Sequence, residues 1–223
     1  MRALAPGVHV TEAPQRFFGL EVGARMTVLE TSGGLLVHSP LPVDPAALAP
    51  LGTPRWVVAP NLLHHLYVGP WIAAGVEAWA PVGLAAKRPD LSFAGVLDTA
   101  GAPFGDEVAV FPLRCFAFTN EVVLLHRPSR TLVVTDLVFN LSPTAPWPTR
   151  AAFACLGGYP GCRTTLLERV GFDRAVARRE IGLLLEQDFD RLILAHGDVV
   201  ETGGREALAG ALGWLGPLAA TGA

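Results

Sequence analysis

The apolar residues of this chain fall into short runs that are separated by polar or turn-forming residues. In the first half, these runs predict strands at 8–10, 26–30, 35–37, 55–59 and 77–79. The sequence Thr-Ser-Gly-Gly at 31–34 predicts a hairpin turn between two of them. Segments 45–51 and 62–76 have the apolar spacing of helices, although Gly69 and Pro70 interrupt the longer one. Glycines and prolines punctuate 86–112, so we expect mostly loop with short strands there.

The second half changes from strands to helices. Apolar runs predict strands at 115–118, 121–126 and 131–135, followed by a proline-rich loop at 142–148. Helical patterns then cover 163–170, 173–187 and 204–215, with one strand at 191–195 among them. Strands on both sides of helices predict a layered α/β architecture, which we expect to form a single domain over residues 1–223.

Composition and charge narrow the class of protein. The chain has 223 residues, 51% of them hydrophobic, and its net charge of −3 argues against a nucleic-acid-binding surface. The longest uncharged stretch, 56–76, contains Pro60, Asn61 and adjacent histidines, which argue against a bilayer span. Three cysteines without a C-x-x-C pair are typical of free thiols in a reducing compartment. We therefore expect a soluble, cytoplasmic protein.

Four of the predicted buried strands end at a polar side chain, most of them able to bind a metal ion. The residues that follow these strands are His38, then Asn61 with His64 and His65, then Asp136, and finally His196 with Asp198. Ligands collect beyond the carboxyl ends of strands in layered α/β proteins, and imidazole and carboxylate groups suit zinc or iron. The coincidence predicts a metal site. Each residue alone also has an ordinary interpretation, because an Asp after a strand often caps a turn and a single His often packs in a core.

Several segments resemble the metallo-β-lactamase-like superfamily, in the right order over nearly the whole chain. GARMTVLETSGGLLVHSP resembles its opening hairpin, and APNLLHHLYVG lies where the family has its H-x-H-x-D-H loop. RTLVVTDLVF resembles the strand that ends in the metal-bridging Asp, and FDRLILAHGDVVETGG resembles the late strand that ends in the last His. PN-x-x-HH, TDLVFN and AHG together are similar to a bacterial family of unassigned function within that superfamily. The resemblance implies a four-layer αββα sandwich.

The departures from the family motif bear on the metal site. The alignment puts Asn61 and Leu63 at the first two His ligands, His65 at the Asp and Leu66 at the final His. Only Thr119, Asn120 and Glu121 lie near the position of the third His, and His38-Ser39-Pro40 replaces the usual Asp-Thr-Gly. The resemblance therefore implies one metal ion rather than two. Its ligands would be His65, Asp136 and His196, with His64 as the alternative to His65, and the roles of His38 and Glu121 stay open.

This donor set favours a mononuclear metal-dependent hydrolase. Three protein ligands plus water is the composition of a catalytic zinc site, and zinc is the preferred ion, with iron or manganese as alternatives. The metal would lower the pKa of bound water from about 16 towards 7 for attack on an ester, amide or phosphoester. His64 or Asp198 would transfer protons, and Asn61 would orient water or an oxyanion.

A second class of function is also open. A degenerate site without metal would make the chain an inactive member of the fold that binds a small molecule or a protein partner, with His65 hydrogen bonded to Asp136. Redox chemistry on iron has no support from a flavin or dinucleotide motif, and the G-x-S-x-G motif of serine hydrolases is absent from the sequence. We expect a small-molecule substrate and neither a nucleic-acid nor a membrane partner.

Overall fold

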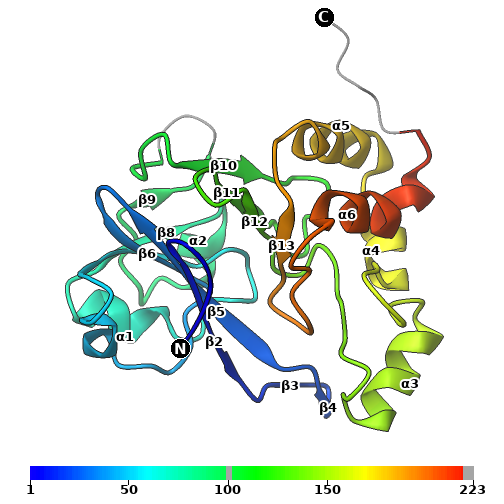
Figure 1. The fold of residues 1–223 in the computed structure, drawn as a ribbon, viewed down its shortest axis with the longest axis horizontal. Coiled ribbons are helices and arrows are strands. Elements are labelled where there is room, and N and C mark those ends of the chain that lie inside the picture. Colours follow the sequence, from blue (N-terminus) through cyan, green and yellow to red (C-terminus); the bar gives the residue numbers. More distant parts are fainter. Residues whose placement is uncertain (99–101, 218–223) are drawn as a thin grey trace, which may run out of the picture.

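The computed structural model describes residues 1–98 and 102–217, in which two β-sheets face each other with helices on both outer sides (Figure 1). The strands are β1 (Arg2–Ala5), β2 (Val8–Ala13), β3 (Arg16–Phe17), β4 (Leu20–Glu21), β5 (Ala24–Thr31), β6 (Gly34–His38), β7 (Pro54–Val58), β8 (Glu77–Ala80), β9 (Gly95–Val96), β10 (Val108–Pro112), β11 (Val122–His126), β12 (Thr131–Val133) and β13 (Arg191–Ile193). The helices are α1 (Val68–Ala73), α2 (Leu84–Lys87), α3 (Trp147–Cys155), α4 (Leu166–Gly171), α5 (Arg174–Leu185) and α6 (Gly204–Leu212). Two short 3₁₀ helices are η1 (Pro45–Leu48) and η2 (Gly213–Leu215).

The larger sheet combines an antiparallel half with a parallel half. Among the described residues its strand order is β1-β2-β5-β6-β7-β8-β9. Strands β5 and β6 are antiparallel and joined by the predicted turn, whereas β6, β7, β8 and β9 run parallel to one another. The carboxyl ends of β6 and β7 therefore reach the same edge of the sheet.

The smaller sheet has the order β10-β11-β12-β13 within the described part of the chain. Strands β10 to β12 form an antiparallel meander, and β13 joins β12 in parallel after the helical segment between them. The parallel pairing sends the chain out of β12 and β13 in the same direction. Residues after these two strands are therefore neighbours.

Side chains on each strand alternate between two apolar layers, as the period of a strand requires. On β7, for example, Val57 packs towards the helical layer of α1 and α2, while Trp56 and Val58 pack between the sheets. On β12, Leu132 packs towards α5 and α6, while Val133 packs between the sheets. Helix, sheet, sheet and helix thus form four layers, which confirms the predicted αββα architecture.

A smaller element lies at one end of the sandwich. The β3–β4 hairpin approaches α3, and both lie at the bottom of the view in Figure 1. Val22, Leu141 and Phe153 form a small buried cluster there. The hairpin and α3 therefore border the edge of the sheets where the polar strand ends meet.

The strand predicted at 115–118 is wrong, because residues 117–119 form a turn. The amides of Arg114 and Cys115 donate to the Glu180 carboxylate of α5 instead of to a neighbouring strand. The strand of this region is β10, which lies inside the stretch predicted to be mostly loop. A short apolar run can form a strand or part of a loop. Here the Glu180 side chain binds the backbone amides of the segment, so the segment does not pair with a neighbouring strand.

One predicted helix and one predicted loop also differ from the structure. The helix predicted over 62–76 is reduced to α1, because residues 61–67 form turns. The segment 142–148 was predicted as loop, yet Trp147 and Pro148 begin α3, since a proline is tolerated in the first turn of a helix. None of the helices in the described part of the chain is long and apolar enough to cross a membrane.

Candidate metal site

The four strand ends singled out in the sequence meet at one edge of the sandwich. Ser39 after β6 contacts His64 in the loop after β7, and Asn61 in that loop contacts Asp136 after β12. Asp136 in turn lies beside His196, which follows β13. The prediction that these strands deliver polar groups to one place therefore agrees with the geometry.

The hydrogen bonds of Asn61 determine which of the two adjacent histidines points towards Asp136. Its side-chain carbonyl accepts the amides of Leu63 and His64 at 2.9 and 2.8 Å, which folds residues 61–64 into a tight turn. The turn directs His64 towards Asp136 and His196. His65, the next residue, points to another part of the molecule.

Three side chains in this edge have the arrangement of a metal-binding triad. His64, Asp136 and His196 each offer one ligand atom, and these atoms all lie within 4.8 Å of one another. The two Nε2 atoms are 3.2 Å apart, His196 Nε2 is 3.2 Å from Asp136 Oδ1, and His64 Nε2 is 3.5 Å from Asp136 Oδ2. Ligands bonded to one tetrahedral zinc ion at about 2.0–2.2 Å are about 3.3–3.6 Å apart. The donor spacing fits a single ion, although the carboxylate uses a different oxygen towards each imidazole.

The protonation of His196 strengthens this interpretation. Its Nδ1 lies 2.6 Å from the carbonyl oxygen of Gly23, which can only accept a hydrogen bond, so Nδ1 carries a proton. In the neutral ring, Nε2 is then an unprotonated acceptor that faces the Asp136 carboxylate. His64 Nε2 lies 3.2 Å from this lone pair and can donate a hydrogen bond to it, so the neutral triad is satisfied without an ion. The same lone pair is directed at the centre of the triad, where it can bind a metal ion.

The second imidazole is also held from behind. Ser39 Oγ lies 2.8 Å from His64 Nδ1, which leaves His64 Nε2 directed at the triad. Ser39 has a φ of +53°, an uncommon conformation for a residue other than glycine, and its side chain is buried. The preceding His38 is also buried, and its Nε2 has no hydrogen-bond partner in the described structure. Burial first and the charge of His64 second lower the pKa of His38 to about 3.

Asp136 is supported by Asn61 and by a buried glutamate. Asn61 Nδ2 donates to Asp136 Oδ2 at 2.7 Å, and the Glu121 carboxylate accepts the amides of Thr135 and Asp136. Burial opposes ionisation of Asp136, but the neighbouring His64 and His196 hold the pKa of Asp136 well below its ordinary value. Burial, together with the charge of Asp136, raises the pKa of Glu121 to about 8. At pH 7 the carboxylate of Asp136 is therefore ionised, whereas Glu121 is mostly protonated and uncharged.

His65, which the sequence alignment assigned to the metal, is engaged elsewhere. Arg88 donates to His65 Nδ1 at 2.8 Å, and Arg88 also pairs with Asp90. Burial, followed by the charges of Lys87 and Arg88, lowers the pKa of His65. The alignment had counted residues from the family motif, whereas the Asn61 turn moves the inward position to His64. The structure therefore brings His64 rather than His65 to Asp136 and His196.

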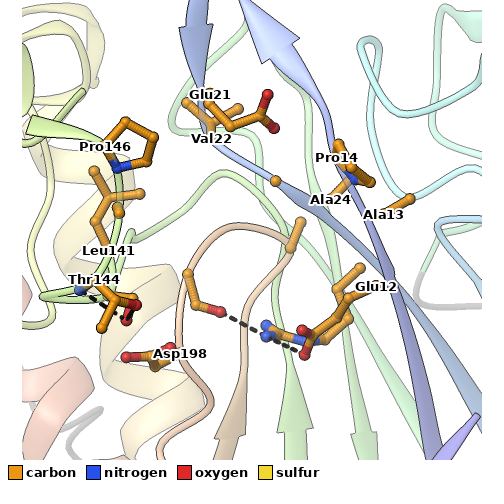
Figure 2. Close-up of a pocket in the computed structure, with 16 residues that line it drawn as sticks. Glu12, Ala13, Pro14, Glu21, Val22, Ala24, Leu141, Thr144, Pro146 and Asp198 are labelled. Atoms are coloured by element: carbon orange, nitrogen blue, oxygen red, sulfur yellow. Dashed lines mark hydrogen bonds and ion pairs between the residues drawn. The ribbon is translucent and has the colours of Figure 1, made fainter. Parts of the chain in front are cut away.

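The candidate catalytic residues Asn61 and Asp198 lie in different surroundings. Asn61 is fully buried, and both ends of its amide are bonded to protein groups. Asp198 is exposed and lines a cavity of about 430 Å³. Figure 2 shows its side chain across the cavity from Glu12, with Leu141, Thr144 and Pro146 forming one wall and Glu21 and Val22 above. Gly23 and Gly197, which adjoin His196 in space or in sequence, also line it.

Sequence reasoning missed three groups that hold the triad. Gly23 binds His196, Phe139 stacks on the His196 ring at a centroid distance of 5.9 Å, and Arg25 binds the loop around His196. The one available signal was Arg25, because a charged residue inside an apolar strand segment needs a buried partner. Nothing in the sequence pattern indicates that a backbone carbonyl such as that of Gly23 orients an imidazole.

Comparison with solved structures identifies the fold. Metallo-β-lactamase FIM-1 from Pseudomonas aeruginosa, in its mono-zinc form, aligns with a TM-score of 0.67 at 13% identity, over 96% of this chain and 95% of that one. The metallo-β-lactamase from Pontibacter korlensis aligns with a TM-score of 0.64 at 15% identity, over 96% and 97% of the two chains. The one from Erythrobacter litoralis aligns with a TM-score of 0.68 at 8% identity, over 94% of each. No protein-family model and no curated protein matches the sequence.

The chain therefore has the metallo-β-lactamase-like fold, as its motifs indicated. Sequence identities of 8–15% carry the fold and nothing more specific. The activity has to be argued from the side chains at the edge of the sheets.

Proposed function

We propose that this protein is a hydrolase that uses one divalent metal ion, held by His64, Asp136 and His196, to cleave an ester or amide bond in a small molecule. Zinc fits the two imidazoles and one carboxylate, and iron or manganese would also suit these donors. The proposal replaces His65 by His64 in the ligand set. It keeps Asp136 and His196.

The meeting of two imidazoles and one carboxylate carries the proposal: the two Nε2 atoms are 3.2 Å apart, and each lies 3.2–3.5 Å from one oxygen of Asp136. His196 Nδ1 donates to the Gly23 carbonyl oxygen, so the Nε2 lone pair faces His64 Nε2 and the carboxylate. A cation at this point satisfies all three groups together.

The second metal ion of a binuclear site has no comparable donor set. Asn61 stands where the family loop has its first His, and its amide donates to Asp136 Oδ2 at 2.7 Å. An amide hydrogen thus occupies the carboxylate oxygen that a bridging Asp would offer to another ion. Within the described residues, the triad is the one group of three His, Cys, Asp or Glu side chains with metal-binding spacing.

A divalent ion in such a site supplies Lewis acidity, which lowers the pKa of coordinated water from about 16 towards 7 and polarises a carbonyl or phosphoryl oxygen. The chain's own groups fix the geometry: Gly23 and Ser39 orient the two imidazoles, and Asn61 orients the carboxylate. We assign proton exchange with solvent to Asp198, which is exposed in the cavity wall two residues after His196.

The cavity adjoins the triad through Gly23 and Gly197, although none of the three proposed ligands lines it, and a substrate entering from it would be uncharged or positively charged. Its lining contains the carboxylates of Glu12, Glu21 and Asp198 and one arginine, Arg25, which is already paired with Glu12. A phosphate group would meet a surplus of negative charge there, whereas a neutral ester or an amine-bearing amide would not. We therefore place esters and amides before phosphoesters.

The test has two parts. Purified protein, expressed with added zinc, iron or manganese, is analysed for bound metal, and we expect about one ion per chain. Neutral esters, lactones, amides and phosphodiesters are then assayed with the loaded protein, with His196→Ala and with His9→Ala, a matched histidine variant outside the site. We expect hydrolysis that His196→Ala abolishes and His9→Ala retains.

Two results would contradict the proposal. One is a wild-type protein that takes up only trace metal under all three conditions. The other is metal uptake that persists at the wild-type level in His196→Ala. Either result, together with silence in the substrate screen, would favour an inactive binding protein of the same fold.

A further inference from the structure

A buried arginine lies beside the triad and takes no part in it. Arg25 is the second residue of β5, and its side chain is only 5% exposed. Its neighbours Ala24 and Met26 pack towards the helical layer, so the alternation of the strand directs Arg25 to the inner face of the sheet. A guanidinium in this position loses its water and needs several partners.

The two backbone partners of Arg25 flank one metal-ligand candidate, and its charged partner lies on the neighbouring strand. Its guanidinium donates to the carbonyl oxygens of Leu194 and Gly197, the residues two before and one after His196. Nε and Nη2 donate to Glu12 Oε1 at 3.1 and 2.8 Å. Glu12 lies directly opposite Arg25 on β2, so the sheet register brings the counter-charge to the arginine. Figure 2 draws the bonds to Glu12 and to Gly197 as dashed lines beside Glu12.

The start of β5 therefore holds both the ring and the backbone of His196. Gly23 binds the ring through Nδ1, and Arg25, two residues later, binds the backbone on both sides of it. Gly197 has a φ of +91°, and a side chain there would collide with the backbone of Asn140, so the loop has one close-packed path. The His64 ring is held by Ser39 rather than by Arg25, although its Nε2 lies 3.2 Å from His196 Nε2.

We propose that Arg25 is a positioning residue that fixes His196 for metal binding by clamping the two carbonyls around it, with Glu12 as its counter-ion. This inference rests on the proposed function, because it concerns the same metal ion. It extends that function by assigning the orientation of one ligand to a strand of the opposite sheet. Arg25 acts on His196 and leaves His64 in place.

The test compares Arg25→Met with Arg25→Lys. Zinc affinity is measured by competition with a chromophoric chelator, and the imidazole nitrogens of the metal-free proteins are observed by ¹⁵N NMR. We expect Arg25→Met to weaken zinc binding about 10- to 100-fold, the range typical of groups that orient a ligand. We also expect it to change the His196 signals more than those of His64, which touches His196 only through Nε2. Arg25→Lys retains the charge and one carbonyl contact, so it should recover part of the loss.

The controls separate positioning from general loosening. Arg130→Met removes an exposed arginine that pairs with Asp188 far along the chain, and it should change neither affinity nor the imidazole signals. Arg25→Met with wild-type affinity and wild-type His196 signals would overturn the inference. Equal disturbance of His64 and His196 would overturn it as well, because it would indicate a loss of structure rather than of one orientation.

Two further results keep the inference distinct from the proposed function. If Arg25→Met does not fold, Glu12→Gln replaces it, with an expected affinity loss of a few-fold and a shift that is larger for the His196 signals than for those of His64. Unchanged His196 signals in Glu12→Gln would then count against Arg25. If the wild-type protein binds no metal, the proposed function fails, while the imidazole spectra of the metal-free variants still decide whether Arg25 positions His196.

Discussion

The two halves of the candidate metal site are built in different ways. Asp136 and His196 follow adjacent parallel strands, β12 and β13, and the backbone of each is held by groups from elsewhere in the fold: Glu121 binds the amide of Asp136, and Arg25 binds the loop of His196. His64 instead lies in a loop of turns between β7 and α1, and its position depends on the Asn61 side chain and on Ser39. One half is fixed by the sheet and the other by local hydrogen bonds.

This difference explains why a metal site can change its loop ligands while it keeps its strand ligands. A residue at the end of a strand has its direction set by the pleat and the register of its neighbours. A residue in a loop can move by one position when a single capping side chain changes. The loop half is therefore the half in which we expect substitutions to alter the ligand set, and the following variants test that view.

The largest effect is expected from the strand half. Asp136→Asn keeps the size of the side chain but removes the negative charge between His64 and His196. We expect metal affinity to fall by more than about 100-fold, beyond the cost of losing an orienting group, because a donor itself is weakened. Isothermal titration with zinc measures this. The exposed variant Asp188→Asn is the matched control, and equal losses in both variants would contradict the assignment.

The paired histidines give the sharpest test of the loop half. His64→Ala removes a triad donor and should abolish tight metal binding with little loss of stability. His65→Ala leaves the triad intact and removes one partner of Arg88, which still pairs with Asp90, so we expect normal metal content and only a small loss in the free energy of unfolding. Metal analysis and urea denaturation of both variants measure the two effects. The reverse pattern would restore His65 as the ligand.

The same contrast describes what the sequence can reveal. Asp136 and His196 were predictable because an apolar strand pattern ends at each of them, and the four-layer fold followed from strand patterns and the order of the motifs. The choice between His64 and His65 was not predictable, because it depends on the hydrogen bond that the backbone amide of His64 donates to the side-chain carbonyl of Asn61. The strand expected at 115–118 failed for a related reason, since Glu180 in a distant helix binds the amides of that segment.

Asn61 connects the two halves, and its removal should cost less than the loss of a donor. Asn61→Ala leaves Asp136 Oδ2 and the amides of Leu63 and His64 without their partner. We expect the free energy of unfolding to fall by about 2–3 kcal/mol and metal affinity to fall by roughly tenfold. Chemical denaturation and zinc titration measure these changes. A stable variant with unchanged affinity would show that the loop does not depend on its cap.

Asn61→Asp serves as the companion variant. It retains the side-chain acceptor for the two amides but replaces the donor to Asp136 with a second carboxylate. We expect the turn to persist and the two neighbouring carboxylates to repel, so that the pair binds a proton more readily. At low pH this proton competes with the metal ion, and affinity there should fall more than in Asn61→Ala. Equal behaviour of both variants would indicate that the contact to Asp136, which both variants lose, and not the turn, sets the geometry.

The smallest effect concerns His38, which lies behind the loop half and affects stability rather than metal binding. Its pKa of about 3 in the folded protein is below the ordinary value of 6.5, so the unfolded chain binds more protons between these pH values. The contribution of neutral His38 is therefore complete above pH 6.5 and is lost as the pH falls. Between pH 7 and pH 5 this amounts to about 2 kcal/mol in the free energy of unfolding.

His38→Leu removes the titrating ring and its unpartnered Nε2, and it keeps an apolar side chain between the sheets. We expect the variant to lose about 2 kcal/mol less than the wild type when urea denaturation is compared at pH 7 and pH 5. Glu121 has the opposite pH dependence, because its pKa is raised from 4.5 to about 8. Its contribution to the free energy of unfolding is complete below pH 4.5 and is lost as the pH rises towards 8. An identical pH dependence in wild type and His38→Leu would mean that the ring is already protonated at pH 5 in the folded protein. The lowered pKa of His38 would then be wrong.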